Sequence, residues 1–243
     1  MKVLSALAGL AAVLAPLAAA APAARAESPR TTMLEFHFGT YTPQVDEQFK
    51  TATPWKDVFG TDSMTLIGLH ADYEVWKGHG TLAIGGGAAY GWISGGALTT
   101  DATTTTKDSV GFNIVPLQAN VIYRWDWAAV EHGVPFVPYV KAGLVATIWW
   151  ATDAGDSIAK TDDLEGVSRT GQGVTFGWQV GGGIQFLLDV LAPGTASEFD
   201  EESGVNNSFI FAEFMHSDVN DFGSSTSINL GDDALSFGLM FEF

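Results

Sequence analysis

The chain has 243 residues, no cysteine, and 28 acidic residues against 11 lysines and arginines, which gives a net charge of −17. The lack of cysteine excludes disulfides and a lipidated N-terminal cysteine. The negative charge argues against nucleic acid as a partner, because nucleic-acid binding depends on cations that neutralise phosphates. Beyond residue 26 no stretch of about 18 apolar residues occurs, so a helical membrane span is not expected.

The first 26 residues have the three-part pattern of a secretory signal peptide. Met1-Lys2 is a basic start, residues 3–17 form an apolar core, and Ala24 and Ala26 lie in the A-x-A cleavage pattern. The short core and Pro16 disfavour the alternative, an N-terminal membrane anchor. We therefore expect a signal peptide (1–26) and an exported domain (27–243) that is large enough for one all-β unit. Without Lys2 and Arg25, nine basic residues remain against 28 acidic ones, a net charge of −19.

Eight runs rich in aromatic and β-branched residues follow in the exported part. They lie at 32–42, 64–76, 81–93, 110–125, 136–150, 174–188, 207–216 and 234–243. Each is close to the nine to eleven tilted residues that cross a bilayer as a strand, and several continue beyond that length. The sequence predicts an all-β fold, an eight-stranded antiparallel up-and-down transmembrane β-barrel.

The connections between the runs alternate in length. Segments 43–63, 94–109, 151–173 and 217–233 are long and polar, whereas 77–80 and 126–135 are short. Short periplasmic turns and long outer loops give this alternation in such barrels. Segment 189–206 falls on the short-turn side but is long, and we expect a helical turn near residues 196–201.

Aromatic residues gather near the two ends of the expected strands. Such girdles form because a ring with a polar group suits the headgroup level of a membrane. The predicted periplasmic rim contains Tyr73, Trp76, Tyr123, Trp125, Trp127, Phe136 and Phe243. The predicted outer rim contains Tyr41, Tyr90, Trp92, Trp149, Trp150, Phe176 and Trp178.

Alternation along the strands separates a lipid-facing wall from the lumen. The residues predicted to face lipid include Ile67, Leu69, Ala71, Tyr73, Leu117, Ala119, Val121, Tyr123, Val140, Ala142, Leu144 and Ile148. Between them lie the polar residues of a predicted lumen network, namely Glu35, His37, His70, Asp72, Glu74, Arg124, Lys141 and Glu213. Placing Glu213 inward also places Phe209 and Phe211 inward. Counted from the periplasmic rim, His37 and His70 fall at similar heights, as do Glu35 and Asp72.

Three interpretations compete for this cluster. The first is a satisfied lumen network in which Lys141 and Arg124 neutralise the acids. The second is a zinc site at Glu35, His37, His70 and Asp72, because two histidines and two carboxylates suit that ion. The third is a hydrolase, which needs a nucleophile beside a histidine. No serine accompanies these histidines on the inner face, and His216 and Ser217 are expected on opposite faces. We favour the network and predict no catalytic residue and no cofactor.

Triple glycines occur in two of the runs, within 84–92 and 176–184. One interpretation is that they allow curvature and let neighbouring side chains lie across the wall. The other is that Gly85, Gly87, Gly181 and Gly183 leave space in the lumen for an apolar ligand.

The last run, 234–243, ends on Phe243 and carries large apolar residues at every second position. In a closed barrel this strand pairs with the first one and leaves no edge. A terminal aromatic residue on such a strand resembles the assembly signature of Gram-negative outer-membrane barrels. That resemblance implies the barrel assembly machinery as a partner, with Phe243 as the signal.

Segments 135–144 (PFVPYVKAGL), 176–194 (FGWQVGGGIQFLLDVLAPG) and 204–214 (GVNNSFIFAEF) resemble a family of small Gram-negative outer-membrane barrels of unassigned function. With the last strand, the resemblance covers most of the chain after about residue 110. It implies location and architecture, and the family offers no catalytic motif to transfer.

The sequence therefore favours a small non-enzymatic barrel with a structural or interaction role and no wide aqueous pore. The alternatives are passage or binding of a small apolar molecule in a partly empty lumen, and a lipid-modifying enzyme. Outer-membrane lipid is the expected partner. The outer loops carry 15 acidic and five basic residues, which indicates a solvated acidic surface; the alternative is that divalent cations bridge these loops to neighbouring anionic lipid headgroups. The sequence does not fix an oligomeric state.

Overall fold

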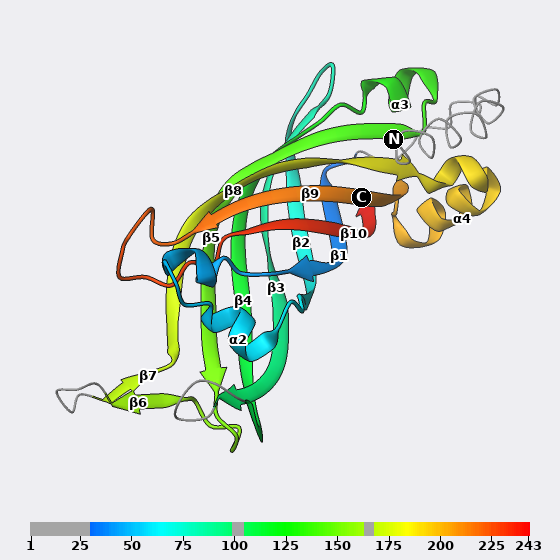
Figure 1. Ribbon diagram of the computed structural model, residues 1–243. Coiled ribbons are helices and arrows are strands. Elements are labelled where there is room, and N and C mark those ends of the chain that lie inside the picture. Colours follow the sequence, from blue (N-terminus) through cyan, green and yellow to red (C-terminus); the bar gives the residue numbers. More distant parts are fainter. Residues whose placement is uncertain (1–29, 99–104, 163–167) are drawn as a thin grey trace, which may run out of the picture.

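The computed structural model describes residues 30–98, 105–162 and 168–243. The predicted signal peptide lies outside these residues. The described chain forms one closed barrel of eight antiparallel strands in the order β1-β10-β9-β8-β5-β4-β3-β2 (Figure 1). The strands are β1 (Thr32–Tyr41), β2 (Met64–Lys77), β3 (Thr81–Leu98), β4 (Thr105–Arg124), β5 (Phe136–Thr152), β8 (Gln172–Leu187), β9 (Asn207–Val219) and β10 (Asp232–Glu242). The predicted fold class is confirmed.

The barrel closes where β1 pairs with β10. The register runs from Met33 opposite Glu242 to Gly39 opposite Ser236. Beyond the last pair, the backbone N–H of Phe243 donates to the carbonyl of Thr32 at 2.8 Å, and the carbonyl of Phe243 accepts from Thr31 at 2.6 Å. The chain termini of the barrel therefore lie at one end, called here the terminal end. The opposite end, which carries the long connections, is called the loop end.

Most long connections keep their predicted lengths, but one is shorter than predicted. The segment 94–109 was expected to be a loop, whereas β3 and β4 extend into it and pair as far as Gly96 with Ser109 and Leu98 with Thr105. Continued pairing gives the backbone N–H and C=O groups of these residues hydrogen-bond partners. Within 151–173 a short hairpin forms from β6 (Lys160–Asp162) and β7 (Ser168–Thr170).

Short helices occupy several connections. At the loop end lie the 3-10 helix η2 (Val45–Gln48) and α2 (Pro54–Phe59). At the terminal end lie α3 (Trp127–His132), the 3-10 helix η3 (Leu188–Leu191) and α4 (Pro193–Ser203). The helical turn expected near residues 196–201 is part of α4. Among the described residues no helix is long and apolar enough to cross a membrane.

The outer wall is apolar and exposed, as alternation predicts. Among the large apolar strand residues, Val140 and Leu144 are the most exposed, at 60% and 61%. The predicted lumen residues are buried except for His37, which is half-buried; the buried ones are Glu35, His70, Asp72, Glu74, Arg124, Lys141 and Glu213. Of the predicted aromatic girdle, Tyr41 and Trp149 face the lumen instead of the lipid, because Trp149 stacks on Phe112 and Tyr41 is buried.

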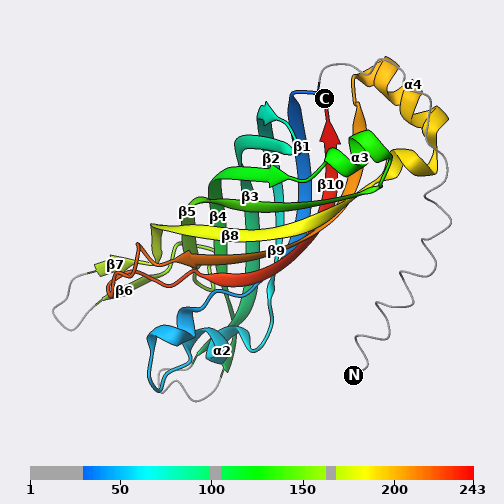
Figure 2. The same cartoon turned by 90° about the horizontal axis from the view of Figure 1, so that it is seen from above.

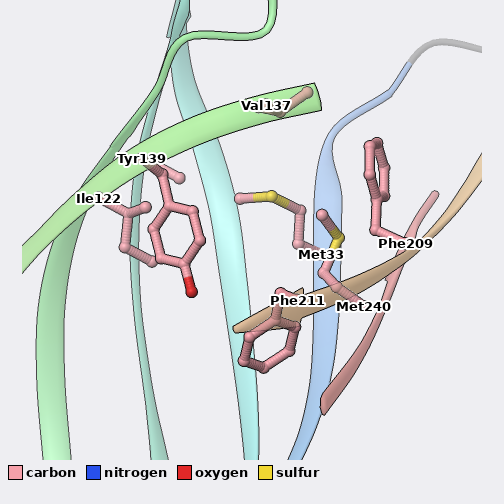
Figure 3. Packing of buried hydrophobic residues seen from close by; sticks show 8 residues of the cluster. Met33, Ile122, Val137, Tyr139, Phe209, Phe211 and Met240 are labelled. Atoms are coloured by element: carbon pink, nitrogen blue, oxygen red, sulfur yellow. The ribbon is translucent and has the colours of Figure 1, made fainter. Parts of the chain in front are cut away.

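Two apolar clusters fill the lumen, one towards each end. The first cluster, near the terminal end, contains Met33, Ala83, Ile122, Val137, Tyr139, Phe209, Phe211 and Met240 (Figure 3). The second cluster, at the loop end, contains Tyr41, Trp55, Met64, Phe112, Ile114, Val145, Val219 and Leu230. Polar side chains lie between and around these clusters, so the sequence-predicted inward placement of Phe209 and Phe211 is also confirmed.

Candidate functional site

A buried ion-pair layer crosses the middle of the lumen. The ammonium nitrogen of Lys141 (β5) lies 3.0 Å from Glu35 (β1) and 3.1 Å from Glu213 (β9). Tyr139 donates its hydroxyl hydrogen to Glu213 at 2.9 Å. Side chains from three separate strands thus meet at Lys141. Alternation along each strand predicts that these side chains face inward, but it does not predict that they contact one another.

The two histidines lie next to this layer. Glu35 pairs with His70 across β1 and β2, and the His70 Nδ1 lies 3.9 Å from the Glu35 carboxylate. The rings of His37 and His70 are 4.8 Å apart. The expected equal heights of Glu35 with Asp72 and of His37 with His70 were both wrong by two residues. Asp72 pairs with Met33, and His37 pairs with Gly68.

Near the middle layer, two buried side chains lack hydrogen-bond partners among the described residues. Neither ring nitrogen of His70 and neither carboxylate oxygen of Asp72 has one, although both side chains are buried. A buried polar group without a partner is costly unless water, an ion or a proton satisfies it. These two side chains are therefore where the network as observed is least complete.

A second ion-pair layer lies towards the terminal end. Arg124 (β4) donates to Glu242 (β10) at 2.8 Å and to the Gln185 side chain at 2.9 Å, and it lies 3.6 Å from Glu74. Lys77 pairs with Glu74 at 2.6 Å. The predicted roles of Arg124 and Glu74 as lumen residues agree with this geometry.

Glu242 is a buried charged residue that the sequence-based network omits. It is fully buried, and it binds Arg124, Asn207 at 2.7 Å and Arg30 at 3.6 Å. The signal was present in the sequence, since Glu242 alternates with the lipid-facing residues of the last strand. The penultimate residue therefore links the seam of the barrel to its lumen.

The inward glycines are covered by side chains of neighbouring strands. A methyl group added at Gly183 would lie 2.8 Å from the Tyr139 hydroxyl oxygen, and one at Gly238 would lie 2.6 Å from the Phe211 ring. The same holds for Gly85 under Asp72, Gly87 under His70, Gly181 under Met215, Gly68 under His37 and Gly143 under Asn120. Glycine leaves room for a large neighbour to lie flat across the wall. The first interpretation of the glycine runs accounts for these contacts.

The remaining space in the lumen is small. A cavity of about 60 Å³ lies towards the loop end, with His37, His70, Gln179, Thr147 and Glu213 in its lining. That volume can hold a few waters, given that one water needs roughly 10–15 Å³ in this measure. A larger, shallow hollow of about 710 Å³ lies over the wall at Ala71, Ala119 and Ala142, which face outward.

The loop end of the lumen is covered by the first long connection. Trp55 of α2 is buried and packs edge-on against Phe112 at 5.5 Å. Asp46 fixes α2 by accepting hydrogen bonds from the backbone of Trp55 at 2.7 Å and Lys56 at 3.1 Å. Gln48 bonds to the backbone of Ser227 and Asn229, at 2.6 Å and 2.7 Å, which fastens this connection to the last loop.

The expectation that no serine shares the inner face with the two lumen histidines was wrong, because Ser217 and Ser236 line the same lumen cavity as His37 and His70. The sequence pattern considered only the adjacent pair His216 and Ser217. His216 points outward and pairs with Asp233 at 2.7 Å, with Trp178 beside it at 5.6 Å. Ser217 alternates to the other face, where its hydroxyl binds the backbone of Asp232. The expected opposite placement of His216 and Ser217 agrees with the structure.

A zinc site requires several ligand side chains to be grouped around one point. Within the described ranges, no three His, Asp or Glu side chains are grouped so that they could hold a metal ion. Glu35 is bound by Lys141, which is itself a cation. A zinc ion at Glu35, His37, His70 and Asp72 would therefore require these side chains to move, and the hypothesis stays a prediction.

The comparisons with known proteins concern the fold. No family model and no curated protein matches the sequence. Among solved structures, Neisserial surface protein A (NspA) is 13% identical, with a TM-score of 0.48 over 89% of this chain and 98% of that chain. The outer membrane protein OprG from Pseudomonas aeruginosa is 11% identical, with a TM-score of 0.48 over 89% and 97%. The outer membrane enzyme PagL is 14% identical, with a TM-score of 0.38 over 88% and 99%.

The barrel itself defines the class of protein. Its backbone is closed without an edge, its outer wall is apolar, and aromatic side chains flank that wall. These are the features by which a strand protein satisfies its hydrogen bonds inside a bilayer. The chain is a small transmembrane β-barrel of the outer-membrane type.

Proposed function

We propose that the chain is a non-enzymatic outer-membrane barrel with a structural or interaction role and no open aqueous pore. The observation that carries this proposal is the ion-pair layer around Lys141, which lies between two apolar clusters. The terminal end of the barrel faces the periplasm and the loop end faces outward, in keeping with the short connections at the first and the long connections at the second.

The filled cross-section argues against ion flow. A hydrated ion would have to displace Tyr139, Phe209 and Phe211 in one apolar cluster and pass the buried charges of the middle layer. Eight strands enclose an interior just wide enough for side chains, so no free path remains beside them. Breaking a buried ion pair is costly, because it leaves a charge without a partner.

The two other candidate functions have less support. Ligand pockets for small molecules usually have volumes of roughly 300–1,000 Å³, whereas the lumen cavity has about 60 Å³. A lipid-modifying enzyme would need a serine hydroxyl bound to a histidine, whereas the hydroxyl of Ser217, which lines the cavity with His37 and His70, binds the backbone of Asp232. The partners proposed for this role are outer-membrane lipid and the barrel assembly machinery, with divalent cations at the outer loops as a further candidate.

Single-channel recording in planar bilayers tests the proposal. We expect no steady conductance from the parent protein or from Trp55→Ala, because the filled lumen closes the barrel below α2. A sixteen-stranded porin is the positive control. Steady conductance of the parent would overturn the proposal. Conductance of Trp55→Ala alone would show that α2, and not the filled lumen, closes the barrel.

A further inference from the structure

The connection between β8 and β9 places a short helical segment at the terminal rim of the barrel. This rim segment consists of η3 and α4, residues 188–203. It lies beside the ends of β9 and β10 and not across the barrel mouth (Figure 2). Its position is fixed partly by Asp189, whose carboxylate accepts a hydrogen bond from the backbone of Ser208 at 3.2 Å.

The rim segment is continuous with the lipid-facing wall. The ring of Phe199 in α4 lies 6.5 Å from Phe241, edge-on, and Phe241 lies 6.4 Å from Phe36 on the next strand. Phe241 lies on the same face as the outward residues of β10, so Phe199 extends the outer apolar surface beyond the last strand residue. Leu191 is 58% exposed and Phe199 is 43% exposed. Apolar side chains at this level would lie where acyl chains meet headgroups.

The polar part of the rim segment carries one sign of charge. Glu198, Glu201 and Glu202 are exposed, and residues 188–203 contain no lysine or arginine. Carboxylates in a headgroup layer repel anionic lipids and attract a primary ammonium group. The negative charge of the three glutamates therefore favours lipids with an ammonium headgroup over anionic lipids.

We propose that the rim segment is a docking surface for phospholipids with a primary ammonium headgroup, such as phosphatidylethanolamine, in the leaflet at the terminal end. Phe199 and Leu191 contact the acyl region, and the three exposed glutamates contact the ammonium groups. This rests on membrane insertion of the barrel, and it is independent of whether the lumen is closed.

The absence of cysteine makes single-site labelling direct. Thr195→Cys in α4 is four residues before Phe199, hence on the same helix face, and would carry a fluorophore in nanodiscs that contain equal amounts of phosphatidylethanolamine and phosphatidylglycerol. One of the two lipids carries brominated acyl chains that quench the fluorophore. We expect quenching at least about twofold stronger with brominated phosphatidylethanolamine, a modest ratio because exposed charge pairs are weak.

Three variants give the controls. A label at Leu239→Cys on the wall should be quenched equally by both lipids, which verifies insertion. A label at Lys50→Cys in an outer loop should not be quenched. Replacing Glu198, Glu201 and Glu202 with glutamine in the Thr195→Cys protein should equalise the two lipids. No quenching at residue 195 despite quenching at 239 would overturn the docking surface, and equal quenching before the glutamine changes would overturn its headgroup preference.

Discussion

The ammonium nitrogen of Lys141 lies 3.0 Å from a carboxylate oxygen of Glu35, with both side chains buried inside the barrel. Replacing Lys141 with methionine keeps the length of the side chain but leaves Glu35 and Glu213 without a cation. We expect the free energy of unfolding to fall by about 3–5 kcal/mol, as for other buried pairs that lose one partner. Urea unfolding in lipid vesicles measures this change, and Lys50→Met in an exposed loop is the matched control.

A second substitution tests whether the middle layer acts as a network. In the Lys141→Met protein, Glu35→Gln removes the charge that has lost its partner and should restore part of the stability. Asp72→Asn should do the same, because its buried carboxylate has no partner of its own. Residues that do not interact give additive losses. Simple addition in both double variants would show that these side chains merely fill the lumen.

The contact between Gly87 and His70 gives a prediction for the glycine runs. A methyl group at Gly87 would overlap the His70 ring and the Leu69 carbonyl. We expect Gly87→Ala to lower the free energy of unfolding by about 1–3 kcal/mol, the usual cost of overpacking. Gly194→Ala, where no atom lies within 4 Å, is the control. In a His70→Ala background, Gly87→Ala should lower the free energy of unfolding by less than it does in the parent. An equal loss in the two backgrounds would contradict the packing explanation.

The sequence predicts the strands and their faces because alternation is a local property. A charged residue such as Lys141 or Arg124 is excluded from the lipid side, so its direction follows from its neighbours along one strand. The same reasoning places the exposed row of the last strand, including Leu235 and Leu239. Glu242 is on the buried face for the same reason.

The register between strands is not a local property, and the sequence alone leaves it open. Glu35 meets His70 and not Asp72 because β1 and β2 are offset by two residues from the predicted heights. Lys141 reaches Glu35 only because β5 and β1 face each other across a closed barrel. Similarly, the extension of β3 and β4 depends on backbone pairing, which has no compositional signal in a threonine- and glycine-rich segment.

Phe243 gives a prediction about assembly. Its backbone completes the seam by bonding to Thr31 and Thr32, and its ring is the proposed assembly signal. Phe243→Ala keeps the backbone bonds and removes the ring, whereas deletion removes both. We expect both variants to insert less into the outer membrane than Thr61→Ala in an outer loop, with deletion the more severe. Heat-modifiable mobility of the membrane fraction measures insertion. Normal insertion of Phe243→Ala would show that the ring carries no signal.

The zinc hypothesis is tested through His37 and His70, whose rings lie 4.8 Å apart at the edge of the lumen cavity. If they bind zinc together with a carboxylate, the metal stabilises the folded state by mass action and raises the unfolding midpoint. Either His37→Ala or His70→Ala should abolish that rise, while His79→Ala in the exposed turn at the terminal end should leave it intact. The measurement compares thermal unfolding in lipid with zinc and with chelator.

Because Lys141 binds Glu35 at 3.0 Å, Lys141→Met should strengthen the zinc effect by freeing that carboxylate and removing a competing cation. A midpoint unaffected by zinc in both the parent and Lys141→Met would exclude the metal site and leave a proton or water as what satisfies His70.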